Sequence, residues 1–165
     1  MSITKSFPPI VNENSTVLIL GTAPGTKSLE LQQYYASPRN QFWKLIFASF
    51  HETEIPDSYE QKINFLLKNG IALWDVIAHC ERMGSLDSNI KDEIPNDFQS
   101  FFDAYPNIKG LAFNGSKSLE VFNKKVSYQG NFSILKLPSS SFARTMPFEA
   151  KLNEWKQIKK YTLSK

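Results

Sequence analysis

Four short apolar runs recur along the chain, at residues 16–20, 70–76, 108–113 and 132–137. Each run is rich in β-branched or aromatic residues and is bounded by glycine, proline or polar residues, which is typical of buried strands. Strands covered on both faces read as continuous hydrophobic runs rather than as an alternation. The pattern therefore predicts four interior strands of one sheet.

Helical periodicity fills the stretches between these runs. Leu152, Trp155 and Ile158, for example, fall on one stripe at spacings of three and three residues. The same logic predicts helices over 40–50, 57–68, 97–105 and 116–126, and a last one from 148 to about 163. Alternation of strands and helices indicates a mostly parallel sheet with helices on both faces. We expect one domain spanning residues 1–165.

In such folds the functional groups lie on loops that follow the carboxyl ends of the strands. The predicted strands place four loops on that rim, at residues 21–28, 75–88, 114–117 and 138–144. Candidate chemistry is therefore sought in these loops.

Composition narrows the classes of protein. The chain has 165 residues and a single cysteine, which excludes an internal disulfide framework, a four-cysteine zinc site and a cysteine-ligated iron–sulfur cluster. No apolar run approaches the ~20 residues of a membrane helix, and the first residues lack a signal-peptide pattern. We expect no membrane association, no metal, no cofactor, and a location in the bacterial cytoplasm or nucleoid.

Charge is distributed unevenly along the chain. Residues 1–104 carry 8 basic and 13 acidic side chains, whereas residues 105–165 carry 11 basic and 3 acidic ones. A basic C-terminal portion is compatible with an anionic partner such as nucleic acid. It is equally compatible with a terminal helix whose solvated face carries Lys151, Lys156, Lys159 and Lys160. Charge alone leaves both interpretations open.

The first rim loop, GTAPGTKS, resembles a phosphate-binding loop only superficially. Thr26 stands where that motif requires its second glycine, and Pro24 lacks a backbone N–H that a phosphate cradle would use. A nucleotide-binding module is therefore the weakest alternative for this protein.

The segment QYYASPRNQFW (33–43) is the most unusual in the chain. Asn40 is a good N-cap for the helix that follows, and the aromatics could belong to the core. Two adjacent tyrosines beside Arg39 also suit a platform that stacks on a base next to a phosphate clamp. The pattern is compatible with both interpretations.

The string LGTAPGTKSLELQQYYASPRNQFW resembles motif 1 of the uracil-DNA glycosylase superfamily. GIALWDVIAHCERMGSLDSNI, AFNGSK and LPSSSFA follow in the order that this superfamily shows. The sequence is most similar to the hypoxanthine-DNA glycosylase (DNA-deoxyinosine glycosylase) branch. The resemblance implies a three-layer α/β/α sandwich around a four-stranded parallel sheet, as one uracil-DNA glycosylase-like domain over residues 1–165.

The same resemblance implies a monomeric, monofunctional enzyme of base-excision repair. It would hydrolyse the N-glycosidic bond of deaminated bases in double-stranded DNA, with hypoxanthine as the first candidate base and uracil and xanthine as further ones. Two alternatives stay open: a mismatch-specific uracil or thymine glycosylase, and a non-catalytic module that binds damaged DNA.

The resemblance also implies site residues, which are assigned by their positions in the matching motifs. Many superfamily members orient water with an Asp or Asn where this chain has Ala23, so the resemblance implies that Asn40 of the PRN element holds the water instead. Tyr35 matches the aromatic that stacks on the flipped base in mismatch-specific relatives. Asp75, or its neighbour Trp74, falls where other branches read the base edge. Such a reaction also needs N–H donors for the departing base. Candidate donors are the amides of Thr22 and Ala23 and the side chain of Asn114.

The last rim loop matches motif 2, which pinches phosphates and wedges the duplex. No histidine precedes Pro138, so the histidine that helps the base to leave in uracil enzymes is absent. Phe142 either wedges the duplex or packs under the final helix. The predicted DNA-binding residues are Arg39, Ser139, Ser140, Ser141, Phe142 and Arg144.

Overall fold

The computed structural model describes residues 2–82 and 90–163. A parallel sheet at its centre contains β2 (Val17–Gly21), β3 (Ile71–Asp75), β6 (Gly110–Asn114) and β7 (Ser133–Leu137), in the order β3-β2-β6-β7. All residues of β2, β3 and β6 are buried. The predicted four-stranded parallel sheet is confirmed, and each strand begins within two residues of its expected start.

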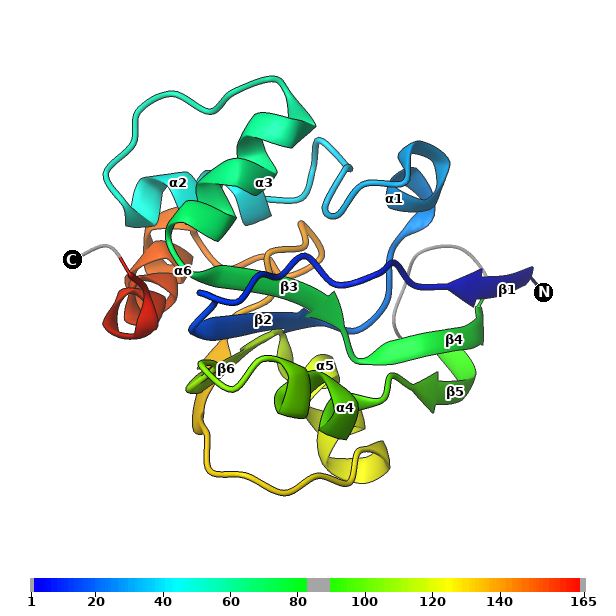
Figure 1. The fold of residues 1–165 in the computed structure, drawn as a ribbon. Helices are drawn as coiled ribbons and strands as arrows, with labels where there is room; N and C mark the ends of the chain where they lie inside the picture. The colour runs from blue at the N-terminus through cyan, green and yellow to red at the C-terminus, as the bar shows by residue number, and fades with distance from the viewer. Residues whose placement is uncertain (1, 83–89, 164–165) are drawn as a thin grey trace.

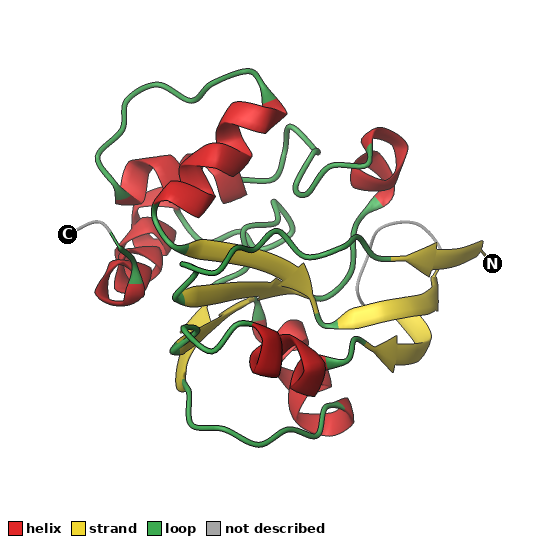
Figure 2. Cartoon of the chain, viewed as in Figure 1, coloured by secondary structure: helices red, strands yellow, loops and turns green. Residues whose placement is uncertain are grey.

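Helices cover both faces of this sheet, as Figures 1 and 2 show. On one face lie α2 (Phe42–Ser49), α3 (Tyr59–Lys68) and α6 (Phe148–Trp155). On the other face lie α4 (Phe98–Ala104) and α5 (Ser116–Lys125). The arrangement confirms the three-layer α/β/α sandwich.

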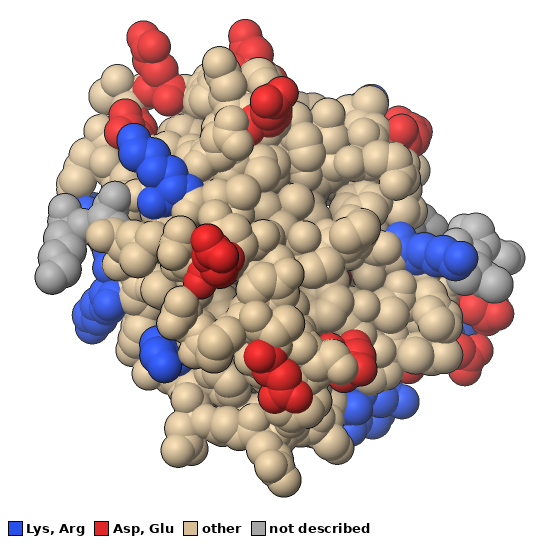
Figure 3. Space-filling model, viewed as in Figure 1, with Lys and Arg blue, Asp and Glu red and all other residues tan. Residues whose placement is uncertain are grey.

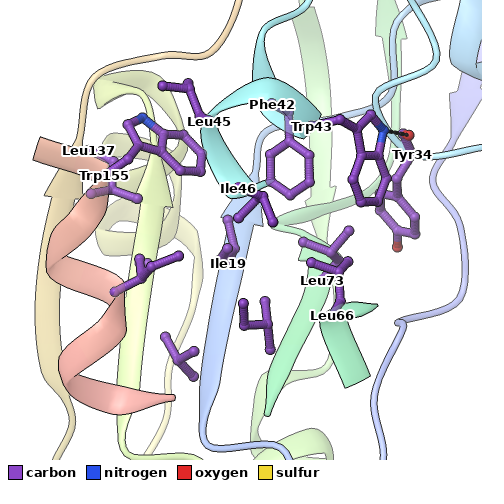
Figure 4. Packing of buried hydrophobic residues seen from close by; sticks show 14 of the residues in the cluster. Ile19, Tyr34, Phe42, Trp43, Leu45, Ile46, Leu66, Leu73, Leu137 and Trp155 are labelled. Atoms are coloured by element: carbon purple, nitrogen blue, oxygen red, sulfur yellow. Dashed lines mark hydrogen bonds between the residues drawn. The ribbon is translucent and has the colours of Figure 1, made fainter. Parts of the chain in front are cut away.

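Successive residues of each strand serve the two faces in turn, because side chains alternate across a sheet. Ile19 and Leu73 belong to a cluster with Phe42 and Ile46 of α2 (Figure 4). Leu18 and Leu20 belong to a second cluster with residues of α4 and α5. The strands thus separate two hydrophobic cores.

Three elements differ from the prediction. β3 and β7 are the edge strands of this sheet rather than interior ones; β3 is nevertheless buried, whereas Ile134 of β7 is 44% exposed. The last helix ends as an α-helix at Trp155, and the chain continues as a 3₁₀-helix over Lys156–Tyr161. The side-chain stripe is similar in both helix types over one or two turns, so the sequence pattern did not distinguish them.

A second, antiparallel sheet was not predicted. It pairs β1 (Ser2–Lys5) with β4 (Ile77–Arg82) and β4 with β5 (Ile90–Pro95). The expectation of a rim loop over 75–88 is therefore wrong for residues 77–82, and its residues 83–88 lie outside the described part of the chain. β4 carries no continuous apolar run, and its partner β1 lies more than 70 residues away in the sequence.

The first rim loop is also shorter than predicted. The helix α1 (Thr26–Leu31) begins inside the expected loop 21–28. Six residues are too few to show a helical period. In the described residues, no helix has the length and apolar character needed to cross a membrane.

Candidate active site

A cavity of about 690 Å³ opens at the carboxyl ends of β2, β3 and β6, which is a size typical of small-molecule sites. Its walls come from the loop after β2, the segment between α1 and α2, and the loop after β7. All of the predicted site residues line it: Thr22, Ala23, Tyr35, Arg39, Asn40, Asp75, Asn114, Ser139, Ser140, Ser141, Phe142 and Arg144. The rim predicted from the strand order therefore forms one site.

Tyr35 adopts an unusual backbone conformation in this wall. Its φ of 54° lies in the left-handed region, which costs a non-glycine residue roughly 1–2 kcal/mol. Its ring stacks on Phe42, with centroids 4.0 Å apart and planes inclined by 12°. Phe42 thus supports one face of the Tyr35 ring, and Tyr35 also lines the cavity.

The neighbouring Tyr34 anchors this strained segment. Its backbone N–H donates to the Tyr59 hydroxyl at 3.0 Å, and its carbonyl accepts from the Trp43 indole at 3.3 Å (Figure 4). Its own hydroxyl donates to the carbonyl of Pro8 at 2.8 Å. Hydrogen bonds to the N–H and to the carbonyl of Tyr34 thus fix the backbone just before Tyr35.

Asp75 lies on the floor of the cavity and is only 4% exposed. Burial raises the pKa of the Tyr34 hydroxyl, and the negative charge of Asp75 raises that pKa further. Asp75 thus places a buried carboxyl group at the base of the cavity, close enough to Tyr34 to affect its hydroxyl.

Gly21 makes room for Asp75 and Tyr35 to approach each other. A Cβ at Gly21 would lie 2.7 Å from Asp75 Oδ1 and 2.9 Å from the Tyr35 hydroxyl oxygen. Both distances are too short for any side chain. The glycine that ends β2 is thus required by the packing of the site floor.

A chain of hydrogen bonds joins four of the predicted residues. Asn114 Nδ2 donates to the Tyr35 hydroxyl at 3.2 Å and to Ser140 Oγ at 2.9 Å. Ser140 Oγ donates in turn to Asn40 Oδ1 at 2.7 Å, and its N–H donates to Asn114 Oδ1 at 2.9 Å. One hydrogen-bond network thereby holds residues 35, 40, 114 and 140.

Asn40 was predicted as the N-cap of the helix, but α2 begins at Phe42 and its N-cap is Gln41. Asn40 Oδ1 nevertheless accepts a second hydrogen bond, from the backbone N–H of Phe42 at 2.9 Å. The side chain is only partly buried and lines the cavity. Asn40 therefore contacts the first residue of α2 and the cavity at the same time.

The loop after β7 presents its three serines differently. Ser139 and Ser141 are partly exposed, whereas Ser140 is 1% exposed. The carbonyl of Ser140 accepts from the backbone N–H of Gln41 at 2.8 Å, so its N–H, hydroxyl and carbonyl are all engaged. A DNA contact by Ser140 would require these bonds to open. Within the described residues, the hydroxyls of Ser139 and Ser141 accept only local backbone hydrogen bonds, from Ser141 N–H at 3.1 Å and from Ala143 N–H at 3.2 Å, and both residues are partly exposed.

Gly115 allows this loop to approach β6. Its φ is +93°, and a Cβ there would lie 3.1 Å from the Cβ of Ser139. The close approach of Ser139 therefore favours glycine at position 115, for a reason that the sequence did not reveal.

Lys151 of α6 corrects one expectation and adds a residue that was missed. One of the two interpretations of the basic C-terminus placed it on a solvated helix face, yet it is 0% exposed. Its ammonium donates to Gln41 Oε1 at 2.9 Å and to the Ser141 carbonyl at 3.1 Å. Burial lowers the pKa of Lys151, and the charge of Arg144 lowers that pKa further. A signal was present, because Lys151 lies on the apolar stripe, three residues after Phe148 and four before Trp155.

The antiparallel sheet supports the opposite wall. Arg82, at the end of β4, is 1% exposed, and its guanidinium donates to the carbonyl of Pro24. Sequence reasoning missed this contact because it placed residue 82 in a loop.

Phe142 and Arg39 meet at the mouth of the cavity. Phe142 is 57% exposed, so the alternative that it packs under the final helix is wrong. The guanidinium carbon of Arg39 lies 4.9 Å from the centre of its ring, within the range of a cation–π contact. Arg144 is exposed nearby. The mouth thus combines positive charge with an exposed aromatic ring.

Charge elsewhere is less concentrated. On the face shown in Figure 3, acidic and basic side chains are dispersed among uncharged ones. In the part of the chain that the structure describes, no three His, Cys, Asp or Glu residues are grouped as metal ligands would be.

Comparison with protein families matches residues 8–162 to the model of the uracil DNA glycosylase superfamily. Two curated proteins named hypoxanthine DNA glycosylase are similar to the chain. The one from Methanosarcina acetivorans is 36% identical over 158 residues, covering 94% of this chain and 98% of its own length. The one from Methanosarcina barkeri is 36% identical over 153 residues, covering 92% of this chain and 94% of its own length.

A solved structure is similar over the same extent. It is a solution NMR structure of a protein from Methanosarcina acetivorans, described as a putative uracil DNA glycosylase. The two folds agree with a TM-score of 0.82 and 35% sequence identity, and the match covers 96% of this chain and 97% of that one. Sequence and fold thus point to the same group of proteins.

Proposed function

The chain belongs to the uracil DNA glycosylase superfamily, and we propose that it is a monofunctional glycosylase that excises hypoxanthine from double-stranded DNA. The proposal rests on the site as well as on the relatives. Tyr35 and Asn40 of the segment between α1 and α2, Asp75 at the end of β3 and Asn114 at the end of β6 line one cavity beside an exposed aromatic mouth.

The reaction requires little covalent chemistry from the protein. Cleavage of an N-glycosidic bond passes through an oxocarbenium-like transition state, in which bond breaking runs ahead of attack by water. Positioning of the reactants then accounts for much of the rate. A cavity built from a neutral amide and an aromatic ring suits such a reaction without a strong nucleophile.

Tyr35 supports capture of an extruded base. An enzyme that acts on a base in a duplex flips the nucleotide out at a cost of a few kcal/mol, least for a poorly paired base. Stacking on an aromatic ring contributes about 1–3 kcal/mol per base. The ring of Tyr35 is braced from behind by Phe42, so it is preorganised for that contact.

Asp75 supports hypoxanthine over the normal base adenine. A carboxylate accepts hydrogen bonds and donates none. Hypoxanthine carries a hydrogen on N1, whereas adenine carries a lone pair there. A base that enters against Asp75 is therefore favoured when its N1 is a donor, which is the result of adenine deamination. Uracil and xanthine also carry a ring N–H and remain candidate substrates.

Arg39, Phe142 and Arg144 support the approach of a duplex at the cavity mouth. Arginine binds phosphate oxygens and fixes the register of a protein on DNA. An exposed apolar side chain at a DNA-binding surface is suited to enter the base stack. Ser139 and Ser141 lie beside them and carry hydroxyls on a partly exposed loop. We propose that the monomer suffices for this contact.

The experiment is base release from otherwise identical duplexes that carry deoxyinosine, deoxyuridine, deoxyxanthosine or a G·T mismatch. We expect the fastest release from deoxyinosine, and strand cleavage only after alkali treatment of the abasic product. We expect Asn40→Ala to abolish release while DNA binding survives. Asn153→Ala, an exposed position on α6, is the matched control.

The other outcomes identify the alternatives. Preferred release from the uracil or G·T duplex would support a mismatch-specific enzyme. Measurable DNA binding with no alkali-sensitive product would support a non-catalytic damage-binding module. An undiminished rate for Asn40→Ala would refute its catalytic role.

A further inference from the structure

The orientation of the Asn40 amide is fixed by a neighbour that can only donate. The backbone N–H of Phe42 points at Asn40 from 2.9 Å, so the atom that faces it must be the oxygen. The same reasoning applies to Asn114, because the backbone N–H of Ser140 faces its oxygen at 2.9 Å. Both amides are therefore oriented by the main chain.

The direction of the remaining bonds follows from these two amides. With its oxygen facing Ser140 N, Asn114 directs one amide hydrogen at Ser140 Oγ and the other at the Tyr35 hydroxyl. Ser140 Oγ receives a hydrogen bond from Asn114, so its own hydrogen points to Asn40 Oδ1, 2.7 Å away. The donors of Asn114, predicted to serve the base, are thus directed at Ser140 and at Tyr35.

The result is a defined polarity at Asn40. Both lone pairs of its Oδ1 are occupied, by Phe42 N–H and by the Ser140 hydroxyl. Its Nδ2 donates to none of the residues in 2–82 and 90–163, and the partly buried side chain lines the cavity. The atom that Asn40 offers to a substrate is therefore the nitrogen with its hydrogens.

We propose that Asn40 acts as a hydrogen-bond donor to the departing base, and that Ser140 is the positioning residue that holds it in this orientation. This refines the proposed function, on which it rests. It differs from the expectation that the carboxamide serves mainly to hold the attacking water.

The chemistry of the reaction explains the need for a donor. As the C1′–N bond breaks, the base leaves with the electron pair and becomes negatively charged. The oxygen of a water molecule bonds to C1′, and the proton that this water loses neutralises the released base. A donor aimed at a ring nitrogen or oxygen of the base stabilises the charge as it develops. This chain has Leu137 before Pro138, where uracil enzymes have a histidine for that purpose, so another donor is required.

The hydrogen bonds behind Asn40 strengthen this role. Two donors on its oxygen draw electron density from the amide, which makes its N–H groups better donors. Ser140 and Asn114 are 1% and 8% exposed, so water competes little with these bonds. These hydrogen bonds thus polarise the Asn40 amide that lines the cavity, and none of them involves a charged group.

Asn40→Asp separates the two modes. The carboxylate keeps both accepted hydrogen bonds, including the one from the first residue of α2, but it replaces the donor at the cavity with an acceptor. A donor role predicts that single-turnover release from deoxyinosine DNA at saturating enzyme falls about 100-fold or more. A water-activating role predicts a rate within a few-fold of the wild type or above it, which would overturn the proposal.

Ser140→Ala tests the positioning role. We expect the saturating single-turnover rate to fall about tenfold to 100-fold, with little change in the enzyme concentration at half-saturation. Ser140→Thr, which retains the hydroxyl, is expected to recover much of the rate. The double variant Asn40→Asp with Ser140→Ala is expected to be no slower than Asn40→Asp alone, because no donor is left for Ser140 to position. Multiplied effects would contradict coupling between the two residues.

The control separates this inference from the function beneath it. Wild-type protein that releases no base from any of the four duplexes would overturn the proposed function and the inference with it. Active wild-type protein whose Asn40→Asp variant keeps its rate overturns the inference alone.

Discussion

Replacing Lys151 with methionine removes a buried ammonium that connects α6 to the segment before α2 and to the loop after β7. The ammonium donates to Gln41 Oε1 and to the Ser141 carbonyl, which lie next to Asn40 and Ser140 in the sequence. Methionine has a similar length and fills the same space without a donor. The substitution therefore tests whether this connection serves the site.

The magnitudes predict a small change in stability and a large one in rate. Each hydrogen bond from a charged donor contributes about 1.5–3 kcal/mol, so two lost bonds cost about 3–6 kcal/mol. Removal of an ammonium from a fully buried position recovers several kcal/mol of desolvation free energy. The two nearly offset each other, so we expect the free energy of unfolding to change by about 2 kcal/mol or less. Displacement of a reacting group by about 1 Å costs up to ~100-fold in rate.

The assay is single-turnover base release at saturating enzyme, with urea denaturation of the same samples. Lys156→Met, at an exposed position just after α6, is the matched control and is expected to keep the wild-type rate. We expect Lys151→Met to lose about tenfold to 100-fold in rate while its stability changes little. A wild-type rate for this variant would refute the reasoning, and so would a rate lost only through unfolding.

Four further predictions follow from single contacts. The pKa of Lys151 is lowered from 10.5 in the folded protein, so Lys151 binds its proton less tightly there than in the unfolded chain. The stability of the wild type relative to Lys151→Met should therefore rise as the pH increases toward 10.5, as measured by urea denaturation at several pH values. A difference that does not change with pH would contradict burial of the charge. Gly115→Ala should lose about 1–2 kcal/mol of unfolding free energy in the same assay, because φ is +93° there; a fully stable variant would argue against that backbone. Tyr35→Ala should slow single-turnover release about tenfold to 100-fold through lost stacking, and an unchanged rate would leave Tyr35 with a packing role only. Phe142→Ala should slow release with no change in melting temperature, because the ring is exposed; equal rates would exclude a wedge.

The sequence predicted the central sheet and five of the helices because these elements carry their own signal. The apolar runs that became β2, β3 and β6 are buried on both faces, and such strands need no partner to be recognised. The antiparallel sheet lacked that signal. β4 (IAHCER) has neither a continuous apolar run nor a regular alternation, and it is stabilised by pairing with β1, far away in the sequence. Its existence depends on tertiary contacts that no local pattern encodes.

The residues that line the site could be predicted from the sequence, but the hydrogen bonds among them could not. The carboxyl ends of the predicted strands place four loops on one rim, and the resemblance added Tyr35, Arg39 and Asn40 from the segment 33–43; all predicted residues line the cavity. The hydrogen bond from Ser140 to Asn40 joins residues 100 positions apart, so its direction depends on three-dimensional geometry. Lys151 illustrates the same limit, because a lysine on an apolar stripe is unusual but does not reveal its partners.

The most direct test of the account is single-turnover incubation of the wild-type protein with a duplex that carries one deoxyinosine. The account predicts release of free hypoxanthine and an abasic strand that breaks only after alkali treatment, both lost in Asn40→Ala, which still binds the duplex. Intact deoxyinosine after prolonged incubation with a folded, DNA-bound wild-type protein would contradict it.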